Sequence, residues 1–128
     1  MIKQSFILDR ANGWKVTCFY AVTHYDAEEI INELYASGAS QRDVEKAYSN
    51  ISSGRMNIGL CYSGENSSVL VVSVSSSPSQ FFNTLFHEVH HLSSHIAMKL
   101  GYDLTGEFVC YLAGDIAENM CQVVLDLL

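Results

Sequence analysis

Two histidines and a glutamate have the types and the spacing of a metal-dependent hydrolytic site. His87, Glu88 and His91 form an H-E-x-x-H motif. Residues four apart on a helix lie one turn apart on the same face, so the two imidazoles can close on a single metal ion. The glutamate between them is placed to take a proton from a metal-bound water. The motif therefore predicts Zn²⁺ ligation by His87 and His91, with Glu88 as the catalytic general base.

The segment that carries this motif is predicted to be an amphipathic helix. Pro78 suits the first turn of such a helix, and Gly101 suits its C-terminal cap. At about 100° per residue, the apolar side chains fall on the side away from His87 and His91. These apolar residues are Leu85, Phe86, Val89, Leu92, Ile96 and Leu100. One side of the helix is expected to pack into a core, and the other to present the imidazoles to a cleft.

Two further histidines lie on the same segment. His90 falls on the flank away from Glu88 and is expected to be a surface residue or to support the ligands from outside. His95 continues the four-residue spacing, but eight residues of helix span about 12 Å, which is too far for three imidazoles to share one ion. His95 is therefore expected to line the cleft or to contact the ligands.

A third ligand is needed, because a catalytic zinc takes three protein ligands and a water. A second amphipathic helix, from 106 to the C-terminus, carries Glu107 and Glu118 on its polar side, about 16 Å apart. In a simple antiparallel helix pair, Asp115 or Glu118 would lie level with the histidines. Glu107 reaches them only if segment 101–106 runs back in extended form, which about 20 Å of chain allows. Glu107 is preferred, with Glu118 as the alternative.

The rest of the chain predicts a small sheet and two more helices in one α+β domain spanning residues 1–128. The strands are expected at 5–9, 14–23, 55–62 and 67–75, and the helices at 26–38 and 40–54. An Asn-Gly pair at Asn12 and Gly13 favours a hairpin between the first two strands.

The composition argues against several classes of partner and compartment. The net charge is -7 and no Lys/Arg cluster occurs, so neither a nucleic acid nor an anionic membrane is an expected partner. No apolar run approaches the roughly 18 residues of a membrane span, and the N-terminal residues lack the features of a signal peptide. Four cysteines without C-x-x-C spacing are typical of reduced thiols. The expected location is cytoplasmic.

The region from 82 to 118 resembles the metal-binding half of the small gluzincin-type zinc metallopeptidases of bacterial and phage type. These proteins pair H-E-x-x-H with a glutamate that opens a segment like E-x-x-x-Y-L-x-G, which is matched here by Glu107, Tyr111, Leu112 and Gly114. The resemblance implies a zincin-like domain with a small, mostly antiparallel sheet, an active-site helix and a following glutamate helix. It also implies that strand 67–75 borders the cleft and pairs with an extended peptide or protein substrate.

The resulting functional prediction is a minimal zinc metallopeptidase. Larger relatives carry an additional subdomain that supplies a His or Tyr to the oxyanion, and this short chain has little room for one. His95, Tyr102 and Tyr111 are the candidates for that role. The alternative is a zinc-binding regulatory or protein-interaction domain that keeps the zincin shell without catalysis. An α+β interaction domain with incidental histidines is the remaining possibility.

Overall fold

The computed structural model describes residues 1–53 and 59–128. In chain order its elements are β1 (Ile2–Leu8), η1 (Asp9–Ala11), β2 (Trp14–Val22), η2 (His24–Asp26), α1 (Ala27–Ala36), α2 (Gln41–Ser52), β3 (Leu60–Ser63), β4 (Ser67–Ser73), α3 (Pro78–Lys99) and α4 (Glu107–Leu127). Here η1 and η2 are short 3-10 turns. The strand expected at 55–62 falls partly on residues outside the described ones. The other predicted strands and helices are all present, with ends that coincide with the predicted ones or shift by up to three residues.

The four strands form a mixed sheet in the order β1-β2-β4-β3. β1 pairs with β2 and β3 pairs with β4 in antiparallel fashion, whereas β2 and β4 run parallel. The parallel pair is possible because α1, α2 and β3 lie between β2 and β4 in the chain and provide the long crossover that parallel strands need. The fold is thus α+β, and its sheet is mixed, with a parallel central pair flanked by two antiparallel pairs.

The position of β4 corrects one expectation. The strand at 67–75 was expected to offer a free edge to a peptide, but β4 lies between β2 and β3 and both of its edges are paired. Among the described strands, β1 and β3 form the two edges of the sheet.

The hairpin between β1 and β2 follows from the local sequence. Asn12 has φ of 59° and Gly13 has φ of 79°, both in the left-handed region that Asn and Gly adopt at low cost. The chain reverses there after η1, and the strands pair from Ile2 opposite Tyr20 to Leu8 opposite Trp14. The predicted turn and hairpin are confirmed.

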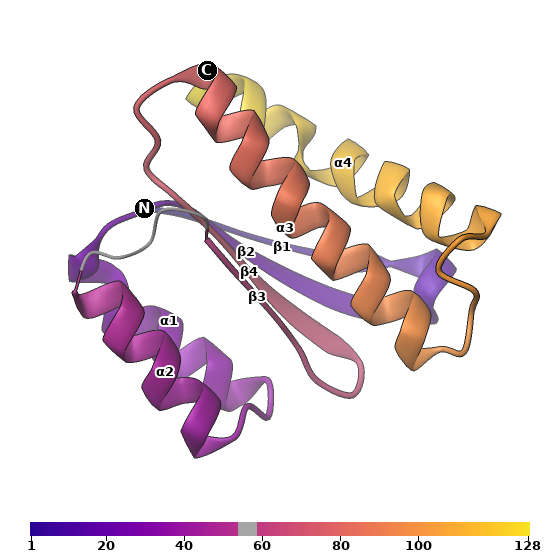
Figure 1. The fold of residues 1–128 in the computed structure, drawn as a ribbon, viewed down its shortest axis with the longest axis horizontal. Coiled ribbons are helices and arrows are strands. Elements are labelled where there is room, and N and C mark those ends of the chain that lie inside the picture. The colour runs from indigo at the N-terminus through magenta and orange to yellow at the C-terminus, as the bar shows by residue number, and fades with distance from the viewer. Residues whose placement is uncertain (54–58) are drawn as a thin grey trace.

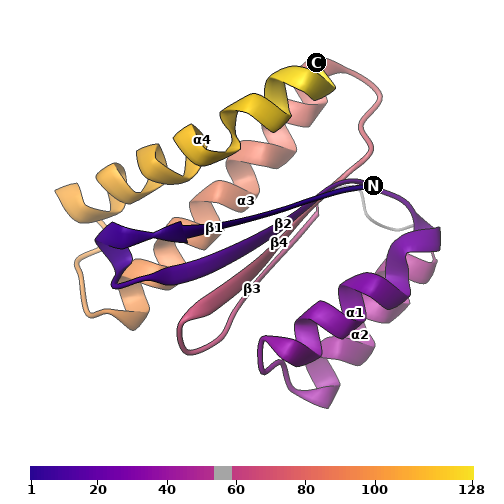
Figure 2. The same ribbon diagram turned by 180° about the vertical axis from the view of Figure 1, so that it is seen from behind.

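Helices cover both faces of the sheet, so the domain has three layers (Figures 1 and 2). α3 and α4 pack on one face, against the side chains of Trp14, Val16, Cys18 and Tyr20. α1 and α2 pack on the other, against Phe19 among others. Alternate residues of β2 thus face opposite cores, as the two-residue period of a strand requires.

The helices α3 and α4 form an antiparallel pair (Figure 1). Ser77 caps α3 by accepting a hydrogen bond from the Gln80 backbone N–H at 3.2 Å, and Pro78 occupies the first turn. By length and composition alone, α4 is long and apolar enough to cross a membrane. Within the fold, 28% of its apolar 18-residue window is buried. Its buried side chains are Val109, Leu112, Ile116, Met120 and Val124.

Candidate active site

The H-E-x-x-H motif lies in the middle of α3, on the flank of the helix next to β3. The rings of His87 and His91 are neighbours, with centroids 4.8 Å apart and planes at 73°. The His87 side chain is 47% exposed, and His91 is also exposed. Both imidazoles are therefore adjacent and accessible, as the four-residue spacing predicts.

Glu88 differs from the two histidines because it is buried, with only 3% of its surface exposed. Its Oε1 lies 3.9 Å from Nε2 of His87. Burial raises the pKa of this carboxyl from 4.5 to about 7, because removal from water disfavours the charged form. A carboxyl with a pKa near neutrality can both accept and return a proton at physiological pH, which is the property of a general base that later acts as an acid.

Gly59 lies close to the Glu88 side chain, and sequence reasoning did not identify it. Its φ is 83°, and an added Cβ would lie 2.3 Å from the Val71 carbonyl oxygen and 3.2 Å from Cγ of Glu88. Only glycine lets the backbone before β3 pass this close to β4 and α3. No periodicity signals such a residue, since its neighbours come from a strand and a helix distant in sequence.

His95 faces β3. Its Nδ1 lies 3.0 Å from Oγ of Ser63 and 3.8 Å from Sγ of Cys61. Burial, and then the positive charge of nearby His91, lower the pKa of His95, so the ring favours its neutral form. Burial and the charge of Glu88 raise the pKa of the Cys61 thiol, which keeps this cysteine protonated. His95 therefore lies beside the motif and against β3.

The remaining side chains of α3 largely follow the helical wheel. Leu85, Val89, Leu92 and Ile96 are buried, and His90 is exposed, as expected. Phe86 is the exception, because it is 62% exposed on the outer side of the α3–α4 pair. The buried side of α3 is thus rotated toward Glu88 and Leu92, relative to the side that the helical wheel predicted.

Glu107 does not join the histidines. It is exposed at the start of α4, beyond the C-terminal end of α3. Segment 101–106 is a folded turn rather than an extended return, since the Gly106 N–H donates to the Asp103 carbonyl at 3.1 Å and the Thr105 N–H donates to Oδ1 of Asp103 at 2.9 Å. The extended connection that Glu107 would need is therefore not formed.

Two further carboxylates of α4, Asp115 and Glu118, lie toward the β1 edge of the sheet. Asp115 accepts a hydrogen bond from Nε of Arg10 at 2.6 Å, in η1 next to β1. Glu118 lines a small cavity with Arg10, Asp115 and Asn119. Because β1 and β3 are at opposite edges, Asp115 and Glu118 lie on the β1 side of the helix pair, whereas His87 and His91 lie on the β3 side.

The two tyrosines proposed for the oxyanion have other contacts. Tyr111 lies under the Arg10 guanidinium, whose Cζ is 5.0 Å from the ring centroid. Tyr102 stacks on Phe108 with centroids 3.7 Å apart, in the turn between the helices. Of the three candidates, only His95 lies beside the motif.

The donor set fits part of a zinc site. Two adjacent, exposed imidazoles with a carboxyl beside them match the α3 contribution to such a site. Within residues 1–53 and 59–128, however, no group of three His, Cys, Asp or Glu side chains lies close enough together to hold a metal ion. The arrangement therefore offers two candidate ligands, and no third candidate lies beside them among these residues.

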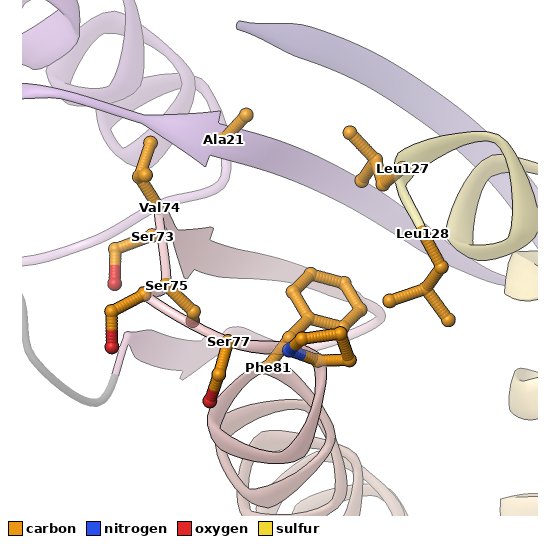
Figure 3. A pocket seen from close by; sticks show the side chains of 10 residues that line it. Ala21, Ser73, Val74, Ser75, Ser77, Phe81, Leu127 and Leu128 are labelled. Carbon is orange, nitrogen blue, oxygen red and sulfur yellow. The ribbon is translucent and has the colours of Figure 1, made fainter.

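A separate pocket of about 250 Å³ lies at the N-terminal end of α3, next to the C-terminus of the chain (Figure 3). It is enclosed by β2, segment 73–78, the first turn of α3 and the last residues of α4. The lining side chains shown include Ser73, Phe81 and Leu128. None of the predicted site residues lines it, so it is distinct from the motif.

Comparison of the chain with protein-family models, with curated proteins and with solved structures finds no match.

Proposed function

We propose that the protein is a zinc-dependent hydrolase that cleaves peptide or related amide bonds, in the manner of the gluzincin-type metallopeptidases that its motif resembles. The observation that carries the proposal is the environment of Glu88. A buried carboxyl with a pKa of about 7 lies directly beside two exposed imidazoles one helical turn apart. A desolvated carboxyl beside two groups that can bind a metal is a combination typical of functional sites.

In this proposal, His87 and His91 hold Zn²⁺ on the β3 flank of α3. The metal, when bound, lowers the pKa of a coordinated water and polarises the scissile carbonyl. Glu88 accepts the proton of the attacking water and returns it to the leaving amine. Its burial against Gly59 keeps the carboxyl in one position and limits the access of bulk water to it.

The third ligand is the open part of the proposal. Glu107 fills this place only if zinc draws the start of α4 toward α3, because segment 101–106 would have to extend. The Asp103 turn and the hydrogen bond from the Tyr102 N–H to the Ala97 carbonyl at 2.8 Å would then break. Glu118 would require a rotation of α4 that separates Asp115 from Arg10.

The free edge of β3 is the proposed binding surface for the substrate. β3 is an edge strand, and the side chains of Cys61 and Ser63 contact His95 on α3. An extended peptide can add to such an edge through main-chain hydrogen bonds. The partner is thus a peptide or protein chain, with β3 replacing the strand at 67–75 as the pairing strand.

A second candidate function is a zinc-binding module without catalysis. The observation that favours it is the position of the α4 carboxylates, which point toward Arg10 and solvent instead of the histidines. Such a module would bind metal through α3, and Glu88 would serve only to pack the helix against β3 and β4.

Zinc content and hydrolysis separate these functions. Wild type, Glu88→Gln and Glu118→Gln are purified, loaded with one equivalent of Zn²⁺, and analysed for bound metal and for cleavage of an unfolded protein such as reduced casein. A hydrolase predicts at least about a hundredfold loss of turnover in Glu88→Gln with zinc retained, and no loss in Glu118→Gln. Equal turnover in wild type and Glu88→Gln, or no zinc binding by wild type, rejects the proposal. Zinc binding with no cleavage by any variant favours the non-catalytic module.

A further inference from the structure

A chain of side-chain hydrogen bonds links the buried core to His95. Nε1 of Trp14 on β2 lies 2.9 Å from Oγ of Ser68 on β4, and this hydroxyl lies 2.7 Å from Oγ of Ser63 on β3. Oγ of Ser63 in turn lies 3.0 Å from Nδ1 of His95 on α3. Trp14 and Ser68 are each only 1% exposed, so the first bond of the chain is shielded from water.

The direction of this chain follows from which groups can donate. The Trp14 indole is a donor only, so Ser68 accepts from it. Within the described residues, the Ser68 hydroxyl has no other side-chain or backbone hydrogen-bond partner than Trp14 and Ser63, so its proton goes to Ser63. Leaving that proton unpaired in the core would cost about 1–3 kcal/mol. The Ser63 hydroxyl then has its own proton to donate, and Nδ1 of a neutral His95 is a stronger acceptor for it than Sγ of Cys61, its other neighbour.

Because Nδ1 accepts a hydrogen bond, the protonation of the other ring nitrogen, Nε2, is determined. In a neutral imidazole that accepts at Nδ1, the proton is on Nε2, which then acts as a donor. Nδ1 faces β3, so Nε2 is on the side of the ring away from that strand. The His91 and His95 rings are 5.9 Å apart between centroids, so this donor borders the proposed metal ligand.

We propose that Trp14, Ser68 and Ser63 are positioning residues that hold His95 in its Nε2–H tautomer. His95 then donates a hydrogen bond to an acceptor oxygen of the ligand bound on this flank, which is the carbonyl of the bond to be cleaved if the proposed hydrolase function holds. The inference rests on that function for the identity of the oxygen, but not for the tautomer. A donor fixed before the ligand arrives stabilises developing negative charge without reorganisation.

The tautomer is measured directly by long-range ¹H–¹⁵N NMR on ¹⁵N-labelled full-length protein at pH 7.5 without metal. His95→Gln identifies the His95 signals. Wild type is expected to show His95 as the Nε2–H form, and Ser63→Ala to show a mixture of both tautomers. Cys61→Ala is the comparison variant, because Sγ of Cys61 also approaches Nδ1, at 3.8 Å, but is only a weak hydrogen-bonding group. An Nδ1–H tautomer in wild type, or a shift in Cys61→Ala and none in Ser63→Ala, overturns the inference.

The donor role is tested by two amides of different length. Gln at position 95 carries its N–H near the place of Nε2, whereas Asn carries it near Nδ1. On the casein substrate with equal zinc content, His95→Asn is expected to lose about a hundredfold in kcat, and His95→Gln to stay within about tenfold of wild type. Equal activity of wild type and His95→Asn overturns the donor role. A wild type without hydrolysis rejects the hydrolase function instead, and the NMR result still decides the hydrogen-bond chain.

Discussion

The helices α3 and α4 are alike in sequence pattern and unlike in the surroundings of their polar sides. Both are amphipathic, and both bury an apolar side in the same core. The flank of α3 next to the β3 edge carries His87, His91 and His95, with the buried Glu88 beside His87. The polar side of α4 lies next to the β1 edge, where Asp115 pairs with Arg10. The two helices therefore face opposite edges of one sheet.

The difference teaches that a helical wheel determines which side of a helix is buried, but not which neighbours its polar side meets. A wheel is a property of one helix, whereas the neighbour depends on the crossing of that helix over the sheet. Two carboxylates that the sequence assigned to one site, Glu88 as the base and Glu107 as a ligand, thus end in different environments. Glu88 is buried with a raised pKa, and Glu107 is exposed.

The largest expected effect is on zinc affinity. His91→Ala removes a proposed ligand on α3, and we expect zinc affinity to fall by at least about a hundredfold, since even partners outside the ligand set are worth about 10- to 100-fold. Glu118→Gln and Glu107→Gln on α4 are expected to leave the affinity unchanged while α4 keeps its position. Competition titration with a chromophoric chelator measures all three. A loss in Glu107→Gln as large as in His91→Ala would show that α4 moves toward α3 on metal binding and would remove the contrast.

The next effect is on stability, at the contact between Gly59 and Glu88. Gly59→Ala places a Cβ 2.3 Å from the Val71 carbonyl oxygen at a positive φ, and we expect a loss of about 2–4 kcal/mol in the free energy of unfolding by urea. Gly38→Ala is the matched control. Its φ is 89°, but nothing lies within 4 Å of the added Cβ, so only the backbone strain of about 1–2 kcal/mol applies. Equal losses in the two variants would show that the packing around Glu88 is not tight.

The third effect depends on pH. The Glu88 carboxyl has its pKa raised from 4.5 to about 7 in the fold, so the folded protein binds more protons than the unfolded chain between these values, and stability falls as the pH rises through them. Glu88→Gln removes this penalty. The free energy of unfolding of Glu88→Gln minus that of wild type is expected to increase by at most about 3 kcal/mol between pH 5 and pH 8. Urea unfolding in the presence of a metal chelator measures this difference. Glu118→Gln, at an exposed site, should show no such growth. A gain independent of pH would mean that Glu88 is not desolvated.

Much of the fold was predictable from local signals. Asn12 and Gly13 predicted the hairpin turn, Ser40 and Ser77 act as helix caps, and the apolar periods placed α3 and α4. These features depend on residues a few positions apart, whose geometry the backbone itself limits. The strand order was not predictable in this way. The parallel pairing of β2 with β4, which places β4 inside the sheet, depends on contacts between segments about fifty residues apart.

The candidate site divides along the same line. The types and spacing of His87, Glu88 and His91 determined by themselves that two imidazoles would be adjacent on one flank of a helix, because 3.6 residues per turn leave no other outcome. Only the tertiary structure decided that Glu88 would be buried against Gly59, that Ser63 would reach His95, and that the α4 carboxylates would lie at the opposite edge. Burial and pKa depend on atoms brought together from several elements, and no single stretch of sequence contains them.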